Sequence, residues 1–300
     1  MKPRIDVCVC TYKRPRMLQR LLSALETQDT HRLFDYSLII VDNDHAASAR
    51  TTVESHARGS AVPVMYYVQP TQSISMARNM AVSAVSAEFV AFIDDDEIPA
   101  SDWLRRMYCA LVDYSADGVF GPVDPVFASP PPAWMVSAGL FMRPTYATTG
   151  AIIDWRRVGM GNVLVHRDVL DALEGPFRLV FAEGGEDVDF FRRAIAIGRR
   201  FIWCGEAHVN ETIPPERLRL SFHVRRALLR GRASRHHPAN SGVGVLKSLV
   251  ACVVYTACLP FLIVLGRHVF VKYLIKDLDH LGKLLALCHI DLIGPGYIVK

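Results

Sequence analysis

The segment from Phe89 to Pro99, FVAFIDDDEIP, constrains the fold more than any other stretch of the chain. An apolar run of Phe, Val, Ala and Ile is typical of a buried strand, and here it ends in four consecutive acids, Asp94 to Glu97. Four like charges repel one another, so folding alone gives little reason to gather them. A divalent cation would neutralise them, and Mg²⁺ or Mn²⁺ suits carboxylate oxygens. The alternative is a solvated turn whose acids cap the helix predicted after Asp102.

Alternating strand and helix patterns predict an α/β protein with a mainly parallel sheet and helices on both faces. Apolar runs bounded by polar residues are typical of buried strands, and stretches with apolar residues three and four apart separate them. Strand, helix, strand is the order of a doubly wound sheet. The predicted strands cover 5–10, 38–41, 64–68, 89–93, 161–165 and 201–204, and the predicted helices begin at Pro15 and cover 75–85, 103–112 and 188–195.

Polar side chains follow three of these strands at the point where each strand ends. Thr11 and Tyr12 follow the first strand, Asp42 follows the second and Asp94 follows the fourth. Ligands of such sheets bind beyond the carboxyl ends of the strands, so the three ends together indicate a binding crevice. The sequence has no G-x-G-x-x-G pattern after the first strand and no Walker lysine loop. The phosphates of a bound nucleotide would need another partner, and a metal on Asp94 and Asp96 would supply it.

A second acidic pair, Glu186-Asp187, follows two glycines and opens a predicted helix. A carboxylate in the first turn of a helix is stabilised by the helix dipole. Two interpretations stay open, which are ordinary helix capping and a general base held at the mouth of the crevice. Between the two acidic clusters, the proline-rich stretch 118–150 is predicted to be irregular, as a binding loop or as a surface loop held by its aromatic residues.

Charge and cysteine content narrow the class of protein. The net charge of +4, from 34 basic and 30 acidic residues, is too small to indicate a nucleic-acid partner. The seven cysteines form no C-x₂-C pair and no zinc-type spacing, which favours a reducing, cytoplasmic setting. Residues 1–10 carry charges and lead directly into a strand pattern, so we do not expect a signal peptide.

The last quarter of the chain predicts contact with a membrane. Arginines with leucines between them run from Arg217 to Arg235 in the pattern of a basic amphipathic helix, which would face solvent or bind anionic lipid. Ser248 to Leu265 is 18 residues without a charge, long enough to span a bilayer, although a buried core helix is the alternative. The amphipathic stretches 269–275 and 281–293 would lie at the interface or form a second, re-entrant leg.

We therefore expect two domains, a catalytic domain over 1–240 and a membrane-associated helical region over 241–300. Basic residues that precede the apolar segment place the catalytic domain on the cytoplasmic side of the inner membrane by the positive-inside rule.

The ordered set of motifs resembles the family 2 glycosyltransferases of the GT-A fold, in the branch of exopolysaccharide and succinoglycan enzymes. The resemblance covers residues 5 to about 230. The matching pieces are VCVCTYKRP at 7–15, IIVDND at 39–44, MARNMAVSAV at 76–85, FIDDDEIP at 92–99, GNVLVHRDVL at 161–170 and GGEDVDFFRRA at 184–194.

This resemblance implies roles for the residues at the strand ends. Thr11 and Tyr12 would line the nucleobase pocket, and Asp42 would accept a hydrogen bond from the base. Asp94 would lie near the ribose and the metal, with Asp95 also on the nucleotide side. Asp96 would bind Mg²⁺ or Mn²⁺ that bridges the two phosphates.

The same resemblance assigns the remaining site residues. Asp187, with Glu186 beside it, would be the catalytic base. Arg78 and Asn79 would help to hold the nucleotide, although an arginine on a helix is more often a structural ion-pair partner. His208 would supply a further metal ligand, although a lone histidine after a strand is more often structural.

The implied activity is inverting transfer of a sugar from a nucleotide-diphosphate donor, with UDP the usual nucleotide of the family, to a glycan or polyprenyl-linked acceptor. Departure of the diphosphate calls for a metal, and the acceptor hydroxyl calls for one base. Two alternatives stay open. A sugar-nucleotide nucleotidyltransferase is disfavoured because the loop after Cys10 has no glycine. A non-catalytic metal-binding scaffold is disfavoured because the acids lack the spacing of an EF-hand.

Overall fold

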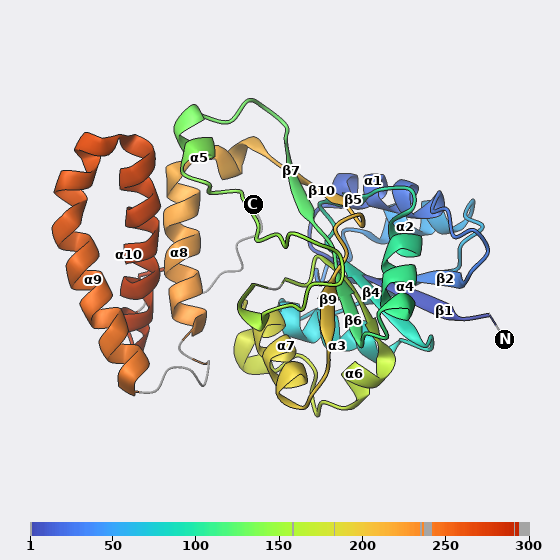
Figure 1. Ribbon diagram of the computed structural model, residues 1–300. Helices are drawn as coiled ribbons and strands as arrows, with labels where there is room; N and C mark the ends of the chain where they lie inside the picture. The colour runs from blue at the N-terminus through green and yellow to red at the C-terminus, as the bar shows by residue number, and fades with distance from the viewer. Residues whose placement is uncertain are drawn as a thin grey trace. The chain divides into compact units, whose positions relative to one another are not determined.

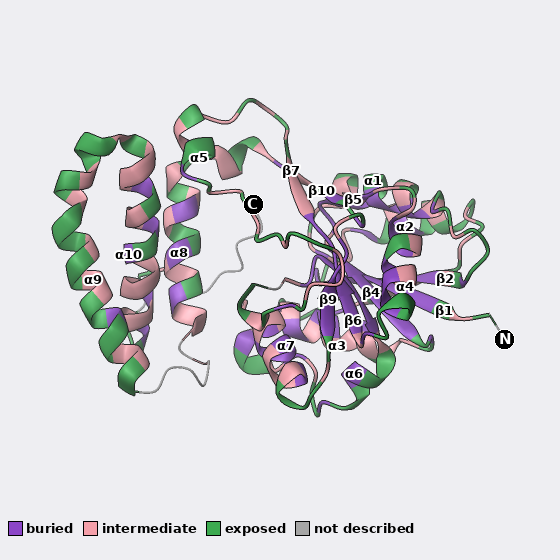
Figure 2. Ribbon diagram, in the orientation of Figure 1, coloured by how far each residue is buried: buried purple, intermediate pink, exposed green. Residues whose placement is uncertain are grey.

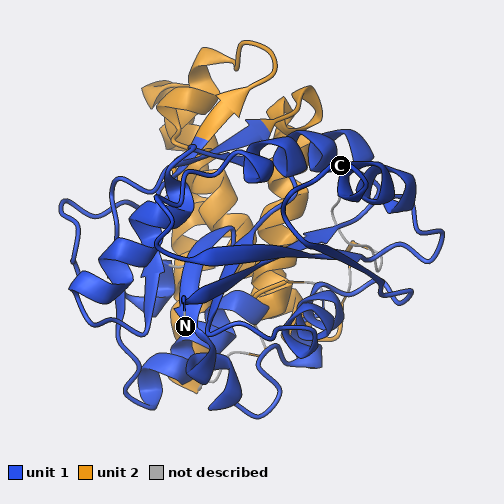
Figure 3. Ribbon diagram, turned by 90° about the vertical axis from the view of Figure 1, so that its right-hand side faces the viewer, with its two compact units in different colours: residues 1–124, 143–182, 186–212 blue, residues 125–142, 183–185, 213–300 orange. Residues whose placement is uncertain are grey.

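The computed structural model describes residues 2–157, 159–182, 184–234, 236, 242–290 and 292–293. The chain forms two compact units (Figure 3). The first unit contains residues 1–124, 143–182 and 186–212, and the second contains 125–142, 183–185 and 213–300.

The first unit is built on a seven-stranded sheet of order β3-β2-β1-β4-β8-β6-β9 (Figure 1). Strand β8 runs antiparallel to its neighbours β4 and β6, and the other pairs are parallel. The predicted mainly parallel α/β sheet is therefore confirmed. The strands are β1 (Arg4–Thr11), β2 (Asp35–Asp42), β3 (Val64–Val68), β4 (Phe89–Ile93), β6 (Gly118–Phe120), β8 (Asn162–His166) and β9 (Phe201–Trp203).

Helices cover both faces of this sheet, and the strands alternate between two cores because successive side chains point to opposite faces. Val7 and Val9 of β1 lie in the core with α1 and α4, whereas Cys8 lies in the core with α3 and α7. Figure 2 shows the strands buried between these layers. The helices are α1 (Pro15–Glu26), α2 (Arg50–Ala57), α3 (Ile74–Ser83), α4 (Trp103–Asp113), α6 (Arg167–Asp171) and α7 (Glu186–Ala196), with the 3₁₀ turns η1 (Trp155–Arg157) and η2 (Leu179–Phe181).

A second, three-stranded sheet of order β5-β10-β7 has no counterpart in the sequence-based prediction. It consists of β5 (Glu97–Pro99), β10 (Val209–Ile213) and β7 (Val123–Phe127). The prediction of an irregular stretch over 118–150 is wrong in part, because β6, β7 and the short helix α5 (Ala133–Ser137) lie within it. Strand β7 contains Pro125 and is an edge strand, where the missing N–H of proline interrupts no ladder.

The second unit is mainly helical. It contains η3 (Pro215–Leu218), α8 (Leu220–Ser234), α9 (Gly242–Leu262), η4 (Ile263–Leu265) and α10 (Arg267–Leu287). The predicted basic helix is α8, although it begins after a 3₁₀ turn and Arg235 lies outside the described residues. The two amphipathic stretches predicted at 269–275 and 281–293 belong largely to one continuous helix, α10.

Two glycines let α8 and α10 approach closely. A Cβ at Gly231 would lie 2.2 Å from the carbonyl oxygen of Asp279, and a Cβ at Gly282 would lie 2.5 Å from that of Leu228. Helix α8 therefore groups with α10 in the second unit, whereas the domain prediction places it with residues 1–240.

Candidate active site

The acids that follow β4 are held by groups at the end of β1. The Thr11 hydroxyl donates a hydrogen bond to Asp95 Oδ2 over 2.8 Å. Arg14 Nη1 lies 3.0 Å from Asp95 Oδ1 and 3.1 Å from Asp96 Oδ2. Asp95 and Asp96 are both buried, and burial disfavours an ionised carboxylate. The hydrogen bonds and the positive charge of these partners offset that cost.

Arg78 joins the two acidic clusters that the sequence places far apart. This buried arginine lies on α3. Its Nη1 donates a hydrogen bond to Glu186 Oε1 at the start of α7, and its Nη2 lies 3.6 Å from Asp94 Oδ1 after β4. The guanidinium therefore brings the end of β4 and the start of α7 to one site, and the binding crevice itself stays a prediction.

Burial and like charges raise the pKa values of these carboxyls. Desolvation raises the pKa of Glu186 to about 7, although Arg78 opposes it and Asp187 adds to it. Desolvation also raises the pKa of Asp95 to about 6, against the charge of Arg14. The pKa of Asp94 is raised by desolvation and by Asp96 beyond what Arg78 offsets. Desolvation therefore favours the neutral form of these three carboxyls, and the nearby arginines offset that effect only in part.

Arg78 itself stays charged. Desolvation lowers its pKa, but the carboxylates of Glu186, Asp94 and Asp187 outweigh that effect, and the net shift is upward. Cys10 on β1 interacts electrostatically with Arg78 and with the acids of the site, and burial raises the pKa of its thiol to about 12. Cys10 is therefore a neutral thiol at ordinary pH and not a nucleophile.

Glu97 fixes the turn that presents the acids. Its side chain is fully buried, and Oε2 accepts a hydrogen bond from the backbone N–H of Asp94 over 3.1 Å. Burial, with the charge of Asp94 adding to it, raises the pKa of Glu97 well above the usual range. A Cβ at Gly161 would lie 2.4 Å from Glu97 Oε1, so a glycine is needed beside this carboxyl.

Asp42 lies at the predicted strand end but is already engaged by protein donors. Its Oδ1 accepts from the N–H of Asp44 over 3.1 Å, and its Oδ2 accepts from the N–H of Ala49 over 2.7 Å and from the hydroxyl of Tyr66 over 2.9 Å. The contact between Asp42 and a base stays a prediction, and in the described residues the carboxylate organises the loop after β2.

Asn79 and Tyr12 have different surroundings. The Asn79 amide exchanges two hydrogen bonds with the backbone of Phe177, at 2.7 Å and 3.1 Å, which ties α3 to a loop. The predicted contact between Asn79 and the nucleotide stays a prediction. Tyr12 is half-buried at the end of β1, and the Lys13 ammonium lies 5.0 Å from its ring centroid.

Asp187 and His208 complete the predicted set. Asp187 is half-buried in the first turn of α7, beside Glu186. His208 Nδ1 lies 2.6 Å from Asp124 Oδ2, and both side chains are about half exposed. The catalytic role of Asp187 and the metal-binding role of His208 stay predictions.

Several residues of this region have no role in the sequence-based prediction. Arg14 forms ion pairs with Asp95 and Asp96. Its position in the TYKRP segment, directly after the first strand, is a sequence signal that could identify it as a site residue. Arg143 Nη2 lies 2.6 Å from Glu211 Oε2, and it also lowers the pKa of Asp94. No local sequence signal marks Arg143, because its partners are distant in sequence.

The carboxylates of the site suit a metal ion that takes some of its ligands from the phosphates of a bound substrate. Among the described residues, no three His, Cys, Asp or Glu side chains are arranged to enclose a metal ion. Mg²⁺ is usually bound through one or two carboxylates together with substrate phosphates. Asp94, whose side chain is 43% exposed, and Asp96 would provide such a partial ligand set.

The fold and the site together define an α/β protein with clustered acids beyond the carboxyl ends of a mainly parallel sheet. The family model described as "Glycosyl transferase family 2" matches residues 6–170, more than half of the chain. The protein therefore belongs to glycosyl transferase family 2.

Its relatives agree with this assignment. The chain is 33% identical over 231 residues to succinoglycan biosynthesis protein ExoM of Rhizobium meliloti (strain 1021), covering 76% of this chain and 72% of ExoM. It is 25% identical over 197 residues to glycosyltransferase AglE of Haloferax volcanii, covering 65% of this chain and 62% of AglE.

Solved structures share the fold. The S. aureus TarS fragment 1–349 in complex with UDP has a TM-score of 0.55 and 15% identity, covering 98% of this chain and 95% of the fragment. The same fragment in complex with UDP-GlcNAc gives the same values. This chain covers 55% of the longer TarS structure. The predicted GT-A type of fold is confirmed, and at this identity the likeness concerns the fold alone.

Among the residues that the structure describes, one segment is long and apolar enough to cross a membrane. It is Gly242–Leu265, that is α9 with η4, and only 6% of its most apolar window is buried. The predicted apolar helix at 248–265 is therefore present, and burial in a core does not account for it.

Proposed function

We propose that this protein is an inverting glycosyltransferase that moves a sugar from a UDP-sugar to a glycan or polyprenyl-linked acceptor during synthesis of a cell-surface polysaccharide. The observation that carries the proposal is the Arg78 bridge, because it connects Asp94 after β4 with Glu186 at the start of α7. One site then has acids that would hold a metal on the donor phosphates, and a second acid pair that would accept the proton of the acceptor.

The acceptor hydroxyl attacks the anomeric carbon of the donor from the face opposite to the leaving UDP. Asp187 accepts the hydroxyl proton as the new C–O bond forms and the bond from the anomeric carbon to the phosphate oxygen breaks. This displacement inverts the anomeric centre, so an α-linked donor yields a β-linkage. The hydrogen bond between Arg78 and Glu186 fixes the start of α7, and with it Asp187, beside the donor site.

Charge on the departing diphosphate needs compensation. Mg²⁺ or Mn²⁺, held by Asp96 with Asp94, would act as a Lewis acid when bound. Arg14 and Arg78 provide fixed positive charge beside the same acids. His208 is the third candidate ligand.

The choice of donor and acceptor draws support from the relatives. The TarS complexes contain UDP and UDP-GlcNAc, which favours a uridine nucleotide here. The name of ExoM concerns succinoglycan, which favours an exopolysaccharide product. The apolar α9 favours an acceptor at the cytoplasmic face of the inner membrane, where lipid-linked glycans are extended.

Transfer of labelled sugar tests the proposal. Membranes that contain the full chain are incubated with radiolabelled UDP-sugars and Mn²⁺, with and without EDTA. We expect labelled lipid-linked or polymeric product that depends on Mn²⁺. Absence of transfer from every common UDP-, GDP- and dTDP-sugar would contradict the enzymatic proposal. Transfer that is unaffected by EDTA would contradict the metal assignment alone.

A further inference from the structure

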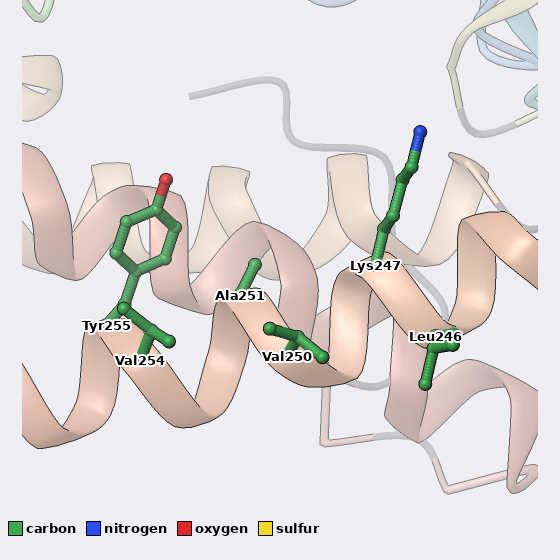
Figure 4. Close-up of a pocket in the computed structure, with 6 residues that line it drawn as sticks. All are labelled: Leu246, Lys247, Val250, Ala251, Val254 and Tyr255. Atoms are coloured by element: carbon green, nitrogen blue, oxygen red, sulfur yellow. The ribbon is translucent and has the colours of Figure 1, made fainter.

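The second unit exposes an apolar surface along α9 and η4. Its exposed side chains include Val253 at 62% and Phe261 at 76% exposure on α9, and Val264 at 84% on η4. Figure 4 shows three further apolar residues, Leu246, Val250 and Val254, along a groove on the same helix. A soluble protein rarely leaves so continuous an apolar surface uncovered. Something must therefore cover this face of the helix.

The other side of α9 is different, because small and polar residues there contact α10. The Thr256 hydroxyl donates a hydrogen bond to Asp277 over 3.0 Å. The Lys283 ammonium donates to the carbonyl oxygen of Gly244 over 3.0 Å. The ring of Tyr255 lies 5.9 Å from that of His280. The contacts move toward the start of α10 as they move along α9, from Gly244–Lys283 to Thr256–Asp277, so the two helices lie antiparallel and side by side, as Figure 1 shows.

Helix α10 cannot enter the hydrocarbon core of a bilayer at low cost. A spanning helix needs about 20 predominantly apolar residues, and charged side chains within it are strongly disfavoured. Helix α10 carries ionisable residues along its length, and they are Arg267, His268, Lys272, Lys276, Asp277, Asp279, His280 and Lys283.

Helix α10 is also joined to α8, which is rich in arginine. Arg230 and Asp279 form a two-pronged ion pair, with distances of 3.0 Å and 2.9 Å. Gly231 and Gly282 bring the two backbones into contact. If α9 crossed the bilayer in this packing, α10 and then α8 would have to follow it, and their charges forbid that.

We propose that α9 does not span the membrane but lies in its plane, with the apolar face that contains Leu246, Val250, Val253 and Val254 immersed in one leaflet and α10 on the aqueous side. The occupant of this face is a lipid surface. Exposed Lys247, Lys272 and Lys276 on α9 and α10 favour an anionic lipid composition. This inference concerns the second unit alone and does not depend on the proposed transferase activity.

Vesicle flotation tests the surface. The purified full chain is mixed with preformed vesicles of phosphatidylethanolamine and phosphatidylglycerol, and the bound fraction is measured. Val253→Lys places a charge in the proposed apolar face, and Ile197→Lys is the matched control at an exposed position of the first unit, 53% accessible. We expect Val253→Lys to lower vesicle binding about tenfold and Ile197→Lys to leave it unchanged. Both positions are exposed, and urea unfolding of each variant verifies that it is folded.

Two results of this experiment would overturn the inference. The first is equal flotation of Val253→Lys and the unmodified chain. The second is a lipid-free dimer that Val253→Lys converts to a monomer, because the apolar face would then be covered by a second copy.

Side-specific labelling separates an in-plane helix from a spanning one. His268→Cys lies just after the junction of α9 and α10, and Arg225→Cys lies on α8. Both are introduced with Cys258 and Cys288 replaced by serine, and intact spheroplasts are treated with a membrane-impermeant maleimide. We expect both cysteines to react only after detergent lysis. Reaction of His268→Cys, but not Arg225→Cys, in intact spheroplasts would show that α9 crosses the membrane and would refute the proposal.

Discussion

Arg78 is the residue on which the geometry of the site depends most. It is buried, with 7% of its surface exposed, and it contacts acids from two elements. Removing one partner of a buried ion pair commonly costs 3 to about 5 kcal/mol, because the other charge is left without compensation. Arg78 and Glu186 should therefore behave as a unit in mutational experiments.

The pKa of Glu186 leads to a prediction about stability. Its pKa in the folded protein is raised to about 7, above the usual value for a glutamate. The unfolded chain therefore releases this proton first as pH rises. The stabilising contribution is fully present below about pH 4 and is lost as pH rises to about 7, by at most about 3 kcal/mol.

Urea unfolding of the unmodified chain and of Glu186→Gln, in EDTA and at several pH values, checks this sign. We expect the stability of the unmodified chain relative to the variant to decrease between pH 4.5 and 7. A relative stability that increases over this range would mean that attraction to Arg78 dominates over desolvation.

Gly161 supports the acids through Glu97. Gly161→Ala places a methyl group 2.4 Å from Glu97 Oε1, so the carboxyl must move away from the Asp94 N–H. We expect a loss of about 2 kcal/mol in stability and a lower affinity for the nucleotide, measured by urea unfolding and by calorimetric titration with UDP. Gly59→Ala is the control, because its Cβ would meet only a backbone oxygen at 4.0 Å. Equal effects of the two substitutions would contradict the role of Glu97.

At the scale of elements, Asn162 connects β8 to its surroundings. Its amide donates to the carbonyl oxygens of Pro122 and Ala207, both over 2.8 Å, and accepts from Trp103 Nε1 over 2.8 Å. Asn162→Ala leaves these buried groups without partners, so we expect a loss of about 3 kcal/mol in the free energy of unfolding. Asn210→Ala on β10 is the matched control, since Asn210 is exposed. A loss below about 1 kcal/mol for Asn162→Ala would show that the loops rearrange around the change.

The elements that the sequence predicts are those with a strong hydrophobic period. Strand β4 is a continuous apolar run that is buried at every position, and apolar residues mark the buried face of helix α1. Strands β5 and β10 escape prediction because polar residues such as Glu97 and Glu211 interrupt their apolar pattern. Their pairing comes from tertiary contact, which a local pattern does not contain.

The acids of the site are predictable from the sequence, whereas the arginines that pair with them are not. Asp94 to Asp96 and Glu186-Asp187 are conspicuous as clusters of like charge. The partners are distant in sequence, since Arg14 precedes Asp95 by 81 residues and Arg78 precedes Glu186 by 108. Only the parallel sheet brings them together, and no spacing rule identifies which arginine pairs with which acid.

At the scale of the whole molecule, each compact unit has its own source of stability. The first unit has two layers of core around a sheet, and the second depends on close contact between α8 and α10. Gly231→Ala would place Cβ 2.2 Å from the carbonyl oxygen of Asp279, so we expect the two helices to separate at a cost of about 3 kcal/mol.

Limited proteolysis and thermal unfolding detect this separation. In Gly231→Ala, cleavage within α10 should become faster, while cleavage of the first unit stays unchanged. Gly242→Ala is the control, because no atom lies within 4 Å of its Cβ position. Equal cleavage rates in the two variants would show that the helices adjust without separating.

We propose that one site contains both the donor acids and a base at the start of α7. The most direct test compares Asp187→Asn with Asp171→Asn, a surface substitution in the Asp171–Arg167 pair, by sugar transfer and by calorimetric binding of UDP with Mn²⁺. We expect Asp187→Asn to lower the transfer rate by 10² to about 10⁴-fold with UDP affinity retained, and Asp171→Asn to change neither. Transfer by Asp187→Asn at the rate of the unmodified protein would refute the role of Asp187 as the base.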